Sequence, residues 1–181
     1  GALLGGFPSE AFGRKKTLLI VAILFLISAI GSALSLEVYS LMFFRFIGGL
    51  GVGASTIAAP AYISEIAPAK HRGRLVALYQ FNIVLGILIA FLSNYLLSDI
   101  GENAWRWMVG VEAFPAIIYS LFVLIVPKSP RWLLSKFRNK EAKDVLSIIN
   151  PDIDPEILLL EMNSNNHNDD LKETIFLKKY R

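Results

Sequence analysis

Two charged residues stand inside segments that are otherwise apolar, and they are the first candidates for chemistry. Arg45 lies about two turns, roughly 10 Å, inside the segment that begins at Val38. Glu112 lies about two turns inside the segment that begins at Trp105. A charge inside a membrane span is costly, and two opposite charges at one depth can neutralise each other. The sequence therefore predicts an Arg45–Glu112 pair in a polar site. The alternative is an arginine that only snorkels to the membrane interface.

A second candidate site is a stripe of two amides and two aliphatic side chains along one apolar segment. Steps of three, four and seven residues stay on one face of a helix with 3.6 residues per turn. Such a stripe suits a sugar, which offers hydroxyl groups for hydrogen bonds and C–H faces for apolar contact. A glutamine in a membrane span can also simply bond a neighbouring helix, and both interpretations stay open here. The stripe consists of Gln80, Ile83, Ile87 and Asn94.

Other kinds of chemistry find little support in the residue types. The chain has no cysteine and only two histidines, His71 and His167, which lie far apart in the sequence. We therefore predict no disulfide framework, no metal site and no cofactor. The net charge of +3 comes from basic residues beside apolar segments, so it does not indicate nucleic-acid binding. A membrane enzyme would need a nucleophile, a metal cluster or paired carboxylates in a span, and the spans carry none.

Four long apolar segments must position these residues. Hydrophobic residues make up 54% of the chain and charged residues 18%, which is too apolar for an ordinary soluble domain. About 24 helical residues at 1.5 Å each cover roughly 36 Å, enough to cross a hydrocarbon core. Residues 1–12 have the pattern of the last turns of an earlier helix, so we expect a fragment of a longer chain. The predicted membrane helices run over residues 17–36, from 38 to a loop at 60–65, and over 74–97 and 105–126.

A run of glycines follows Arg45 on the second of these helices. Gly49 and Gly53 are four residues apart, a spacing that lets a neighbouring helix backbone approach closely. A phosphate-binding loop would need a preceding strand, and the setting here is apolar. The glycine run therefore predicts helix packing.

Lysines and arginines alternate between many and few from one loop to the next. The turn at 13–16 and the loop after residue 65 carry three each, and the segment after Val126 carries ten. The loops at 37 and 99–103 carry none. Because positive charge marks the cytoplasmic side, the three basic segments are predicted to be cytoplasmic. Their charges could merely flank the membrane, but their bunching favours an ionic network of Arg14, Glu65, Arg72 and Arg131.

Past Pro127 the sequence becomes amphipathic. Ser129 and Pro130 predict the N-cap and first position of a short helix. Further helices are expected at 141–149, from Asp154, and at 170–180, with a polar linker at 163–170. None of these is long enough to span a membrane. A disordered tail beyond residue 163 is the alternative.

Five motifs occur in a fixed order along the chain. They are GGFPSEAFGRKK at 5–16, Arg45 with its glycines, YISEIAP at 62–68 followed by RGR at 72–74, WRWM at 105–108, and PKSPRWL at 127–133. In this order they resemble the sugar porter family of the major facilitator superfamily, especially bacterial proton-coupled xylose symporters and the related glucose facilitators. The resemblance covers roughly residues 5–135.

The resemblance implies an all-α membrane protein: a partial major facilitator amino-terminal helical bundle plus short cytoplasmic helices. Residues 1–127 would hold the end of helix two and helices three to six, and residues 128–181 a cytoplasmic helical linker. Helix one and the second half of the transporter would lie outside the chain. The expected location is a bacterial inner (plasma) membrane, which the protein crosses several times.

The resemblance also assigns roles to the candidate residues. In the family, the residues that match Arg45 and Glu112 adjoin a proton-carrying aspartate on helix one. The glutamine that matches Gln80 binds sugar hydroxyls, and the residues that match Ile83 and Ile87 line the cavity. The expected function is secondary active transport of a monosaccharide, by proton symport through alternating access. A sugar uniporter and a transporter-like sugar sensor are the alternatives.

Two departures from the family pattern concern the cytoplasmic charges. In the family these charges form a latch between the two halves that holds the outward-open state. Where the family usually has Asp-Arg before the basic turn, this chain has Glu10 and Ala11, which keeps the acid and loses the base. Lys128 replaces a glutamate, which reverses the charge. Both departures change the expected network and leave the expected fold unchanged.

Overall fold

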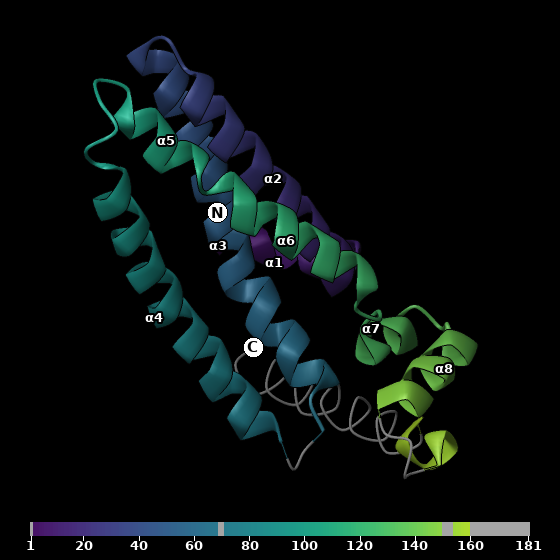
Figure 1. The fold of residues 1–181 in the computed structure, drawn as a ribbon. Helices are drawn as coiled ribbons and strands as arrows, with labels where there is room; N and C mark the ends of the chain where they lie inside the picture. The colour runs from purple at the N-terminus through teal and green to yellow at the C-terminus, as the bar shows by residue number, and fades with distance from the viewer. Residues whose placement is uncertain (1, 69–70, 150–153, 160–181) are drawn as a thin grey trace, which may run out of the picture. The chain divides into compact units, whose positions relative to one another are not determined.

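The computed structural model describes residues 2–68, 71–149 and 154–159, most of which are helical (Figure 1). They belong to two compact units, Gly1–Pro127 and Lys128–Arg181. The helices of the first unit are α1 (Ala2–Ala11), α2 (Arg14–Leu34), α3 (Val38–Ile66), α4 (Arg72–Leu97), α5 (Ala104–Gly110) and α6 (Ala113–Ile125). The second unit holds α7 (Pro130–Ser135) and α8 (Asn139–Ile149).

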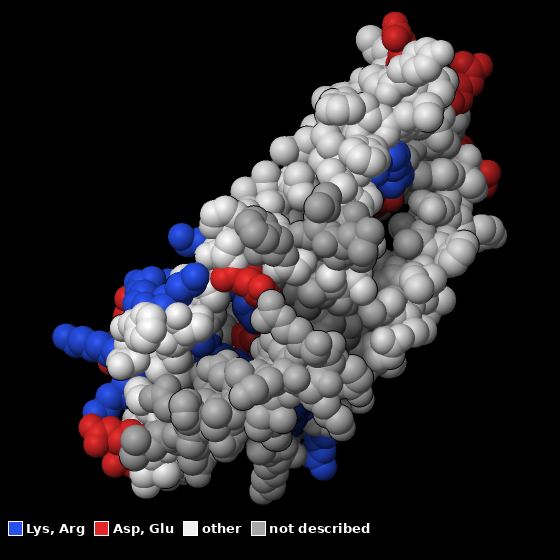
Figure 2. Space-filling view, turned by 180° about the vertical axis from the view of Figure 1, so that it is seen from behind, with Lys and Arg blue, Asp and Glu red and all other residues white. Residues whose placement is uncertain are grey.

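Four stretches of the first unit are long and apolar enough to cross a membrane. They are Arg14–Leu34, Val38–Ile66, Arg72–Leu97 and Ala104–Ile125. On the face drawn in Figure 2, a basic and an acidic side chain meet in a hollow that is surrounded largely by uncharged surface. Together with the absence of strands from the described residues, these spans confirm the predicted all-α membrane fold.

The helix that carries Arg45 is longer than the sequence predicted. The predicted loop at 60–65 is wrong, because α3 continues through Pro60 and ends at Ile66. A proline removes one helical hydrogen bond. Residues on both sides of it are buried, Ala58 fully and Tyr62 nearly so. Tyr62 also donates a hydrogen bond of 2.6 Å from its hydroxyl to the carbonyl of Pro127. Packing on both sides of Pro60 therefore stabilises α3 beyond the proline. Glu65 lies in the last turn of α3.

The last predicted span is two helices. It breaks at Val111 and Glu112, between α5 and α6. Pro115 has no N–H to donate to the carbonyl of Val111, and the N–H of Phe114 donates to that carbonyl instead, at 3.1 Å. The N–H of Glu112 likewise bonds one residue short, to Val109 at 3.3 Å. The break is therefore a proline kink, and it carries the acidic residue.

The turn between the first two helices also differs from the prediction. Gly13 alone makes the turn, with φ 89°, a conformation that glycine adopts without steric cost. The basic residues Arg14, Lys15 and Lys16 form the first turn of α2 instead. At its other end α2 stops at Leu34, two residues before the predicted end.

Close approach between α2 and α3 involves Gly48 and Gly51 of the predicted glycine run, together with Gly31 of α2. A Cβ on Gly31 would meet the Phe44 ring, and a Cβ on Gly48 would meet the Ser28 hydroxyl. A Cβ on Gly49 would meet no described atom within 4 Å, so no described helix packs against that residue.

Burial in the first unit is uneven. Leu18, Ala58, Tyr62 and Val123 form its core cluster, contributed by α2, α3 and α6. In contrast, α4 has no buried residue, although it touches α3 and α5. In Figure 1, α2 runs beside α3 and α6, whereas α4 lies along one side of α3.

The second unit follows the capping pattern read from its sequence. The Ser129 hydroxyl accepts a hydrogen bond from the Trp132 N–H at 3.2 Å, with proline at the first helical position of α7. Leu133, Leu134 and Ala142 form a small core between α7 and α8. Residues 155–159 are helical, as predicted from Asp154 onward. The linker and helix predicted over 163–180 lie outside the described residues.

Candidate functional site

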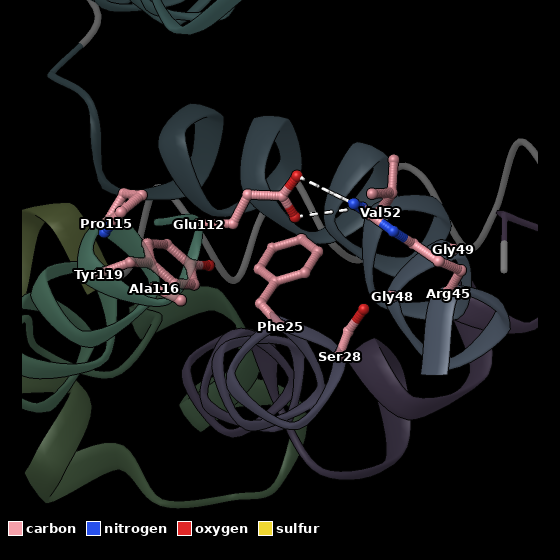
Figure 3. Close-up of a pocket in the computed structure, with 10 residues that line it drawn as sticks. All are labelled: Phe25, Ser28, Arg45, Gly48, Gly49, Val52, Glu112, Pro115, Ala116 and Tyr119. Atoms are coloured by element: carbon pink, nitrogen blue, oxygen red, sulfur yellow. Dashed lines mark hydrogen bonds and ion pairs between the residues drawn. The ribbon is translucent and has the colours of Figure 1, made fainter. Parts of the chain in front are cut away.

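Arg45 and Glu112 meet across the space between α3 and the kink before α6. The Arg45 Nη1 donates to both carboxylate oxygens of Glu112, at 3.3 Å and 3.2 Å, and Nη2 donates to Oε1 at 3.4 Å. Figure 3 shows the two side chains extended toward each other from their separate helices. Arg45 therefore pairs with Glu112 in this structure, and snorkelling is not needed to account for its charge.

The pair lines one wall of a cavity of about 380 Å³. Figure 3 shows Phe25 beside the ion pair, Tyr119 next to Glu112, and Ser28 pointing toward the glycines of α3. Side chains of Arg45 and Glu112 keep 45% and 52% of their surface exposed, so the pair is open to this cavity. The remaining lining residues are Gly48, Gly49, Val52, Pro115 and Ala116.

This arrangement is suited to a change of protonation or partner. A carboxylate at a helix break has freer backbone neighbours than one inside an unbroken helix. A new cation or hydrogen-bonding group that entered the cavity could therefore compete for Glu112 or Arg45 without unfolding the bundle.

The predicted sugar stripe lies on α4, away from the residues that line this cavity. Ile83 and Ile87 are 41% and 52% exposed, and Gln80 and Asn94 are exposed as well. None of the four is among the residues that line the Arg45–Glu112 cavity. The stripe is thus an exposed helix face with an amide at each end.

The predicted cytoplasmic network is present in part within the first unit. Arg14 donates from Nε to Glu65 Oε1 at 3.0 Å and from Nη1 to the carbonyl of Ser9 at 2.8 Å. The two side chains are only 19% and 8% exposed. Arg72 lies exposed in the first turn of α4 and forms no ion pair with another described residue. Arg131 belongs to α7 in the second unit.

Several contacts escaped the sequence analysis. Lys15 donates from Nζ to the carbonyl of Leu124 at 2.9 Å, so it and Tyr62 both satisfy carbonyls at the end of α6. Lys128, the charge-reversed position, pairs with Glu141 at 3.1 Å inside the second unit. A basic residue thirteen positions before an acid carries no periodic signal, so only tertiary structure could disclose this pair.

Glu141 is the centre of a small charged cluster outside the spans. Hydrogen bonds from Lys128 and Arg138 hold the pKa of Glu141 below its usual value. A hydrogen bond to Glu156 at 2.5 Å raises the pKa of Lys143 in the same way. As to metals, no three candidate ligands gather anywhere in the part of the chain that the structure describes.

Comparison with known proteins gives consistent matches along the chain. The model of the family described as "Sugar (and other) transporter" matches residues 1–181. Among curated proteins, the chain is 42% identical over 154 residues to a D-xylose transporter of Levilactobacillus brevis, which covers 83% of this chain and 34% of that protein. It is 42% identical over 149 residues to an arabinose-proton symporter of Escherichia coli, covering 82% of this chain and 31% of that protein. A glucose transport protein of Synechocystis sp. is 40% identical over 161 residues, covering 81% and 34%.

Solved structures give the same result. The partially occluded inward-open form of the xylose transporter XylE of E. coli superposes with a TM-score of 0.83 at 34% identity, covering 90% of this chain and 43% of that one. The same symporter bound to 6-bromo-6-deoxy-D-glucose also reaches a TM-score of 0.83, at 33% identity, covering 92% of this chain and 39% of that one. The chain matches the amino-terminal half of that fold. It spans 34% of the length of the curated D-xylose transporter, about a third.

Proposed function

The chain belongs to the sugar (and other) transporter family, and from that premise we propose that it forms the amino-terminal half of a proton-coupled monosaccharide transporter. This half would rock against a second bundle around a site near the middle of the membrane. Residues 1–127 form the membrane bundle of the proposal, and residues 128–181 a cytoplasmic linker to the other half. The membrane in question would be a bacterial inner membrane.

One observation carries the coupling part of the proposal: the Arg45–Glu112 pair is exposed to a cavity and sits at a kink. A proton carrier needs a carboxylate whose charge is balanced in one state and altered in the next. We propose that Arg45 and Glu112 set the charge balance around a proton-carrying group supplied by the rest of the transporter. The presence of proton symporters of arabinose among the relatives supports this choice.

The coupling proposal is tested by Glu112→Gln in the complete transporter reconstituted in proteoliposomes. This change keeps the shape of the side chain and removes its charge, so Arg45 loses its compensation. We expect sugar accumulation driven by a proton gradient to fall at least tenfold, while sugar counterflow, which needs no net proton movement, falls less than threefold (a tenfold change corresponds to about 1.4 kcal/mol).

A matched control comes from the other ion pair. Glu65→Gln removes a carboxylate of equal size from the partly buried pair with Arg14. It should lower both activities together, because it alters stability and conformational balance rather than coupling. If Glu112→Gln leaves accumulation and counterflow at the wild-type level, the pair is structural. If wild-type transport proves independent of the proton gradient, the protein is a uniporter and the coupling proposal fails.

For the substrate, we propose that Gln80 and Asn94 hydrogen-bond sugar hydroxyls while Ile83 and Ile87 contact its apolar faces. The stripe is reachable, as all of α4 is, and its combination of two amides with two aliphatic side chains on one helix face supports this choice. The second half of the transporter would close the cavity over them. The relatives that are named for xylose, arabinose and glucose support a monosaccharide as the substrate class.

Finally, we propose that Arg14, Glu65, Arg72 and Arg131 belong to a latch between the two halves. The Arg14–Glu65 pair supports this role, since it already ties the start of α2 to the end of α3. In this chain Lys128 pairs with Glu141 in the second unit, which keeps its reversed charge occupied locally. The departure at Lys128 is thus compatible with the latch.

A further inference from the structure

A second cavity, separate from the ion-pair site, opens at the other end of α2, where it meets α5 and α6. Its volume is about 840 Å³, and more than half of its boundary residues are apolar. Leu34 contributes from α2, and Phe114 and Ile117 from α6. The polar boundary residues, Asn103 and Arg106, are the N-cap of α5 and a residue of its first turn.

Arg106 is held in place but is incompletely bonded. Its guanidinium lies 4.9 Å from the ring centre of Trp105, a stacking contact that orients the planar group. The Arg106 Nε is buried and has no hydrogen-bond partner among the described residues. An unbonded buried donor is costly. Arg106 as a whole is only partly buried and lines the groove, so an acceptor in the groove can reach its guanidinium.

The apolar part of the groove continues from the arginine toward the middle of the spans. Leu34, Phe114 and Ile117 are 70%, 69% and 48% exposed. They lie in or at the end of stretches that are long and apolar enough to cross a membrane, so an acyl chain is a fitting neighbour for them. The indole of Trp107 lines the same groove, and tryptophan is typical of the headgroup level of a membrane.

We propose that this groove binds one glycerophospholipid. The phosphate accepts hydrogen bonds from the guanidinium of Arg106 and the amide of Asn103, and one acyl chain lies along Leu34, Phe114 and Ile117. The charge match supports this occupant, because a planar guanidinium pairs with a phosphate through two parallel hydrogen bonds. The order of groups supports it as well: one cation at the headgroup level, then an apolar trough, reproduces the order of a phospholipid from phosphate to chain.

The test uses native mass spectrometry of the complete transporter, stripped of lipid in detergent. Three probes separate the sources of the chemistry. Dioleoyl phosphatidylglycerol carries both phosphate and chains, dioleoylglycerol carries chains alone, and glycerol-3-phosphate carries phosphate alone. We expect a single retained adduct with phosphatidylglycerol and none with the other two at the same concentration.

Three variants then locate the site. Arg106→Ala should weaken phosphatidylglycerol binding about tenfold, the effect of losing a charge-assisted hydrogen bond. Arg74→Ala removes the same charge from the exposed first turn of α4 and should change binding less than twofold. Ile117→Trp keeps the arginine and fills the trough, so it should also weaken binding at least fivefold. Circular dichroism checks that each variant keeps the wild-type helix content.

Each contrary outcome overturns the proposal. If Arg106→Ala, with normal helix content, binds phosphatidylglycerol as tightly as Arg74→Ala does, the arginine holds no phosphate. If Arg106→Ala loses its helix content, Ile117→Trp decides, and unchanged binding by that variant rejects the groove. Equal retention of dioleoylglycerol would mean that lipids coat the apolar surface without a site. Binding of glycerol-3-phosphate alone would mean an anion site that uses no acyl chain.

Discussion

Helices α2 and α4 are both long, apolar membrane spans, yet they pack in opposite ways. The structure buries seven residues of α2 and none of α4. The buried residues of α2 include small and hydroxyl-bearing side chains such as Thr17, Ser28, Ala29 and Ser32. The exposed surface of α4 instead carries large aliphatic and aromatic side chains. Apolar composition alone therefore does not decide which span faces protein.

Small residues help to explain why α2 packs, because lipid chains are as apolar as leucine. A span gains little from moving leucine or isoleucine out of lipid and into a protein contact. Small residues change this balance because they let backbones approach and let van der Waals contacts accumulate. In this bundle the small residues of α2 meet the glycines of α3, and Gly48 stands against Ser28. The comparison predicts that equal substitutions will have unequal effects on the two helices.

The largest expected effect is a loss of stability when one methyl group is added to α2 at Gly31. Gly31 is in α2, and a Cβ there would come within 2.5 Å of the Phe44 Cγ. Because Cγ is the first atom beyond Cβ, rotating the ring in place cannot relieve the clash. Gly31→Ala should therefore lower the free energy of unfolding by about 2 kcal/mol, in the range of overpacked cores. Unfolding of the chain by SDS in mixed micelles, followed by circular dichroism, measures this.

Gly86→Ala in α4 is the matched control for that experiment. A Cβ at Gly86 would meet no atom within 4 Å. Alanine also has a higher helix propensity than glycine, so the variant should be as stable as wild type or up to about 1 kcal/mol more stable. Equal destabilisation by both substitutions would remove the difference between a packed α2 and an open α4.

The next largest effect concerns the sugar site that is proposed on α4. Gln80→Ala in the complete transporter should weaken sugar binding roughly ten- to hundredfold, because buried hydroxyl groups of the sugar would lose a partner worth about 1–3 kcal/mol. The stability of the transporter should change little, since Gln80 is exposed on α4. Calorimetric titration with a panel of pentoses and hexoses measures the affinity.

Asn82→Ala serves as the control for the stripe. Asn82 is two positions from Gln80, which on a helix points it to a different side. This variant should keep the wild-type affinity for the best sugar of the panel. If Gln80→Ala binds as tightly as wild type, or if Asn82→Ala loses affinity equally, the proposed sugar stripe is on the wrong face of α4.

The smallest expected effect is a change in the pKa of Glu141, in the second unit. Lys128 and Arg138 lower the pKa of Glu141. The pairs therefore add to stability above the ordinary carboxyl pKa, and this contribution is lost as the pH falls through the lowered pKa. A ¹³C NMR titration of the Glu141 carboxyl should give a midpoint below that of an exposed glutamate, and Lys128→Met should move it upward.

Unit 2 should keep its helix content when Lys128→Met is made, because exposed ion pairs contribute little to stability. Its small core of Leu133, Leu134 and Ala142 is untouched by that change. An unmoved midpoint in the variant would mean that Arg138 alone perturbs Glu141. A large loss of helix would show that surface charge matters here as much as packing does in α2.

Much of the membrane architecture was predictable because it follows from composition and spacing. A bilayer requires long apolar helices, so the four spans and their order were visible in the sequence. The N-cap at Ser129 was predictable because its hydrogen bond is local. Errors arose where distant packing overrides a local signal: Pro60 did not end α3, and the span from Trp105 divided at the kink before Pro115.

The sequence by itself determined the residue types of the candidate site and their depth in the spans, because depth follows from counting along a helix. Only the tertiary structure decided which of them meet: Arg45 reaches Glu112, Arg14 reaches Glu65, and Lys128 reaches Glu141. It also decided that Gly31 and Gly48, rather than Gly49, face the neighbouring helix. A helix repeats its own geometry every 3.6 residues, whereas its rotation against a partner is set by the whole interface, to which residues far apart in the chain contribute.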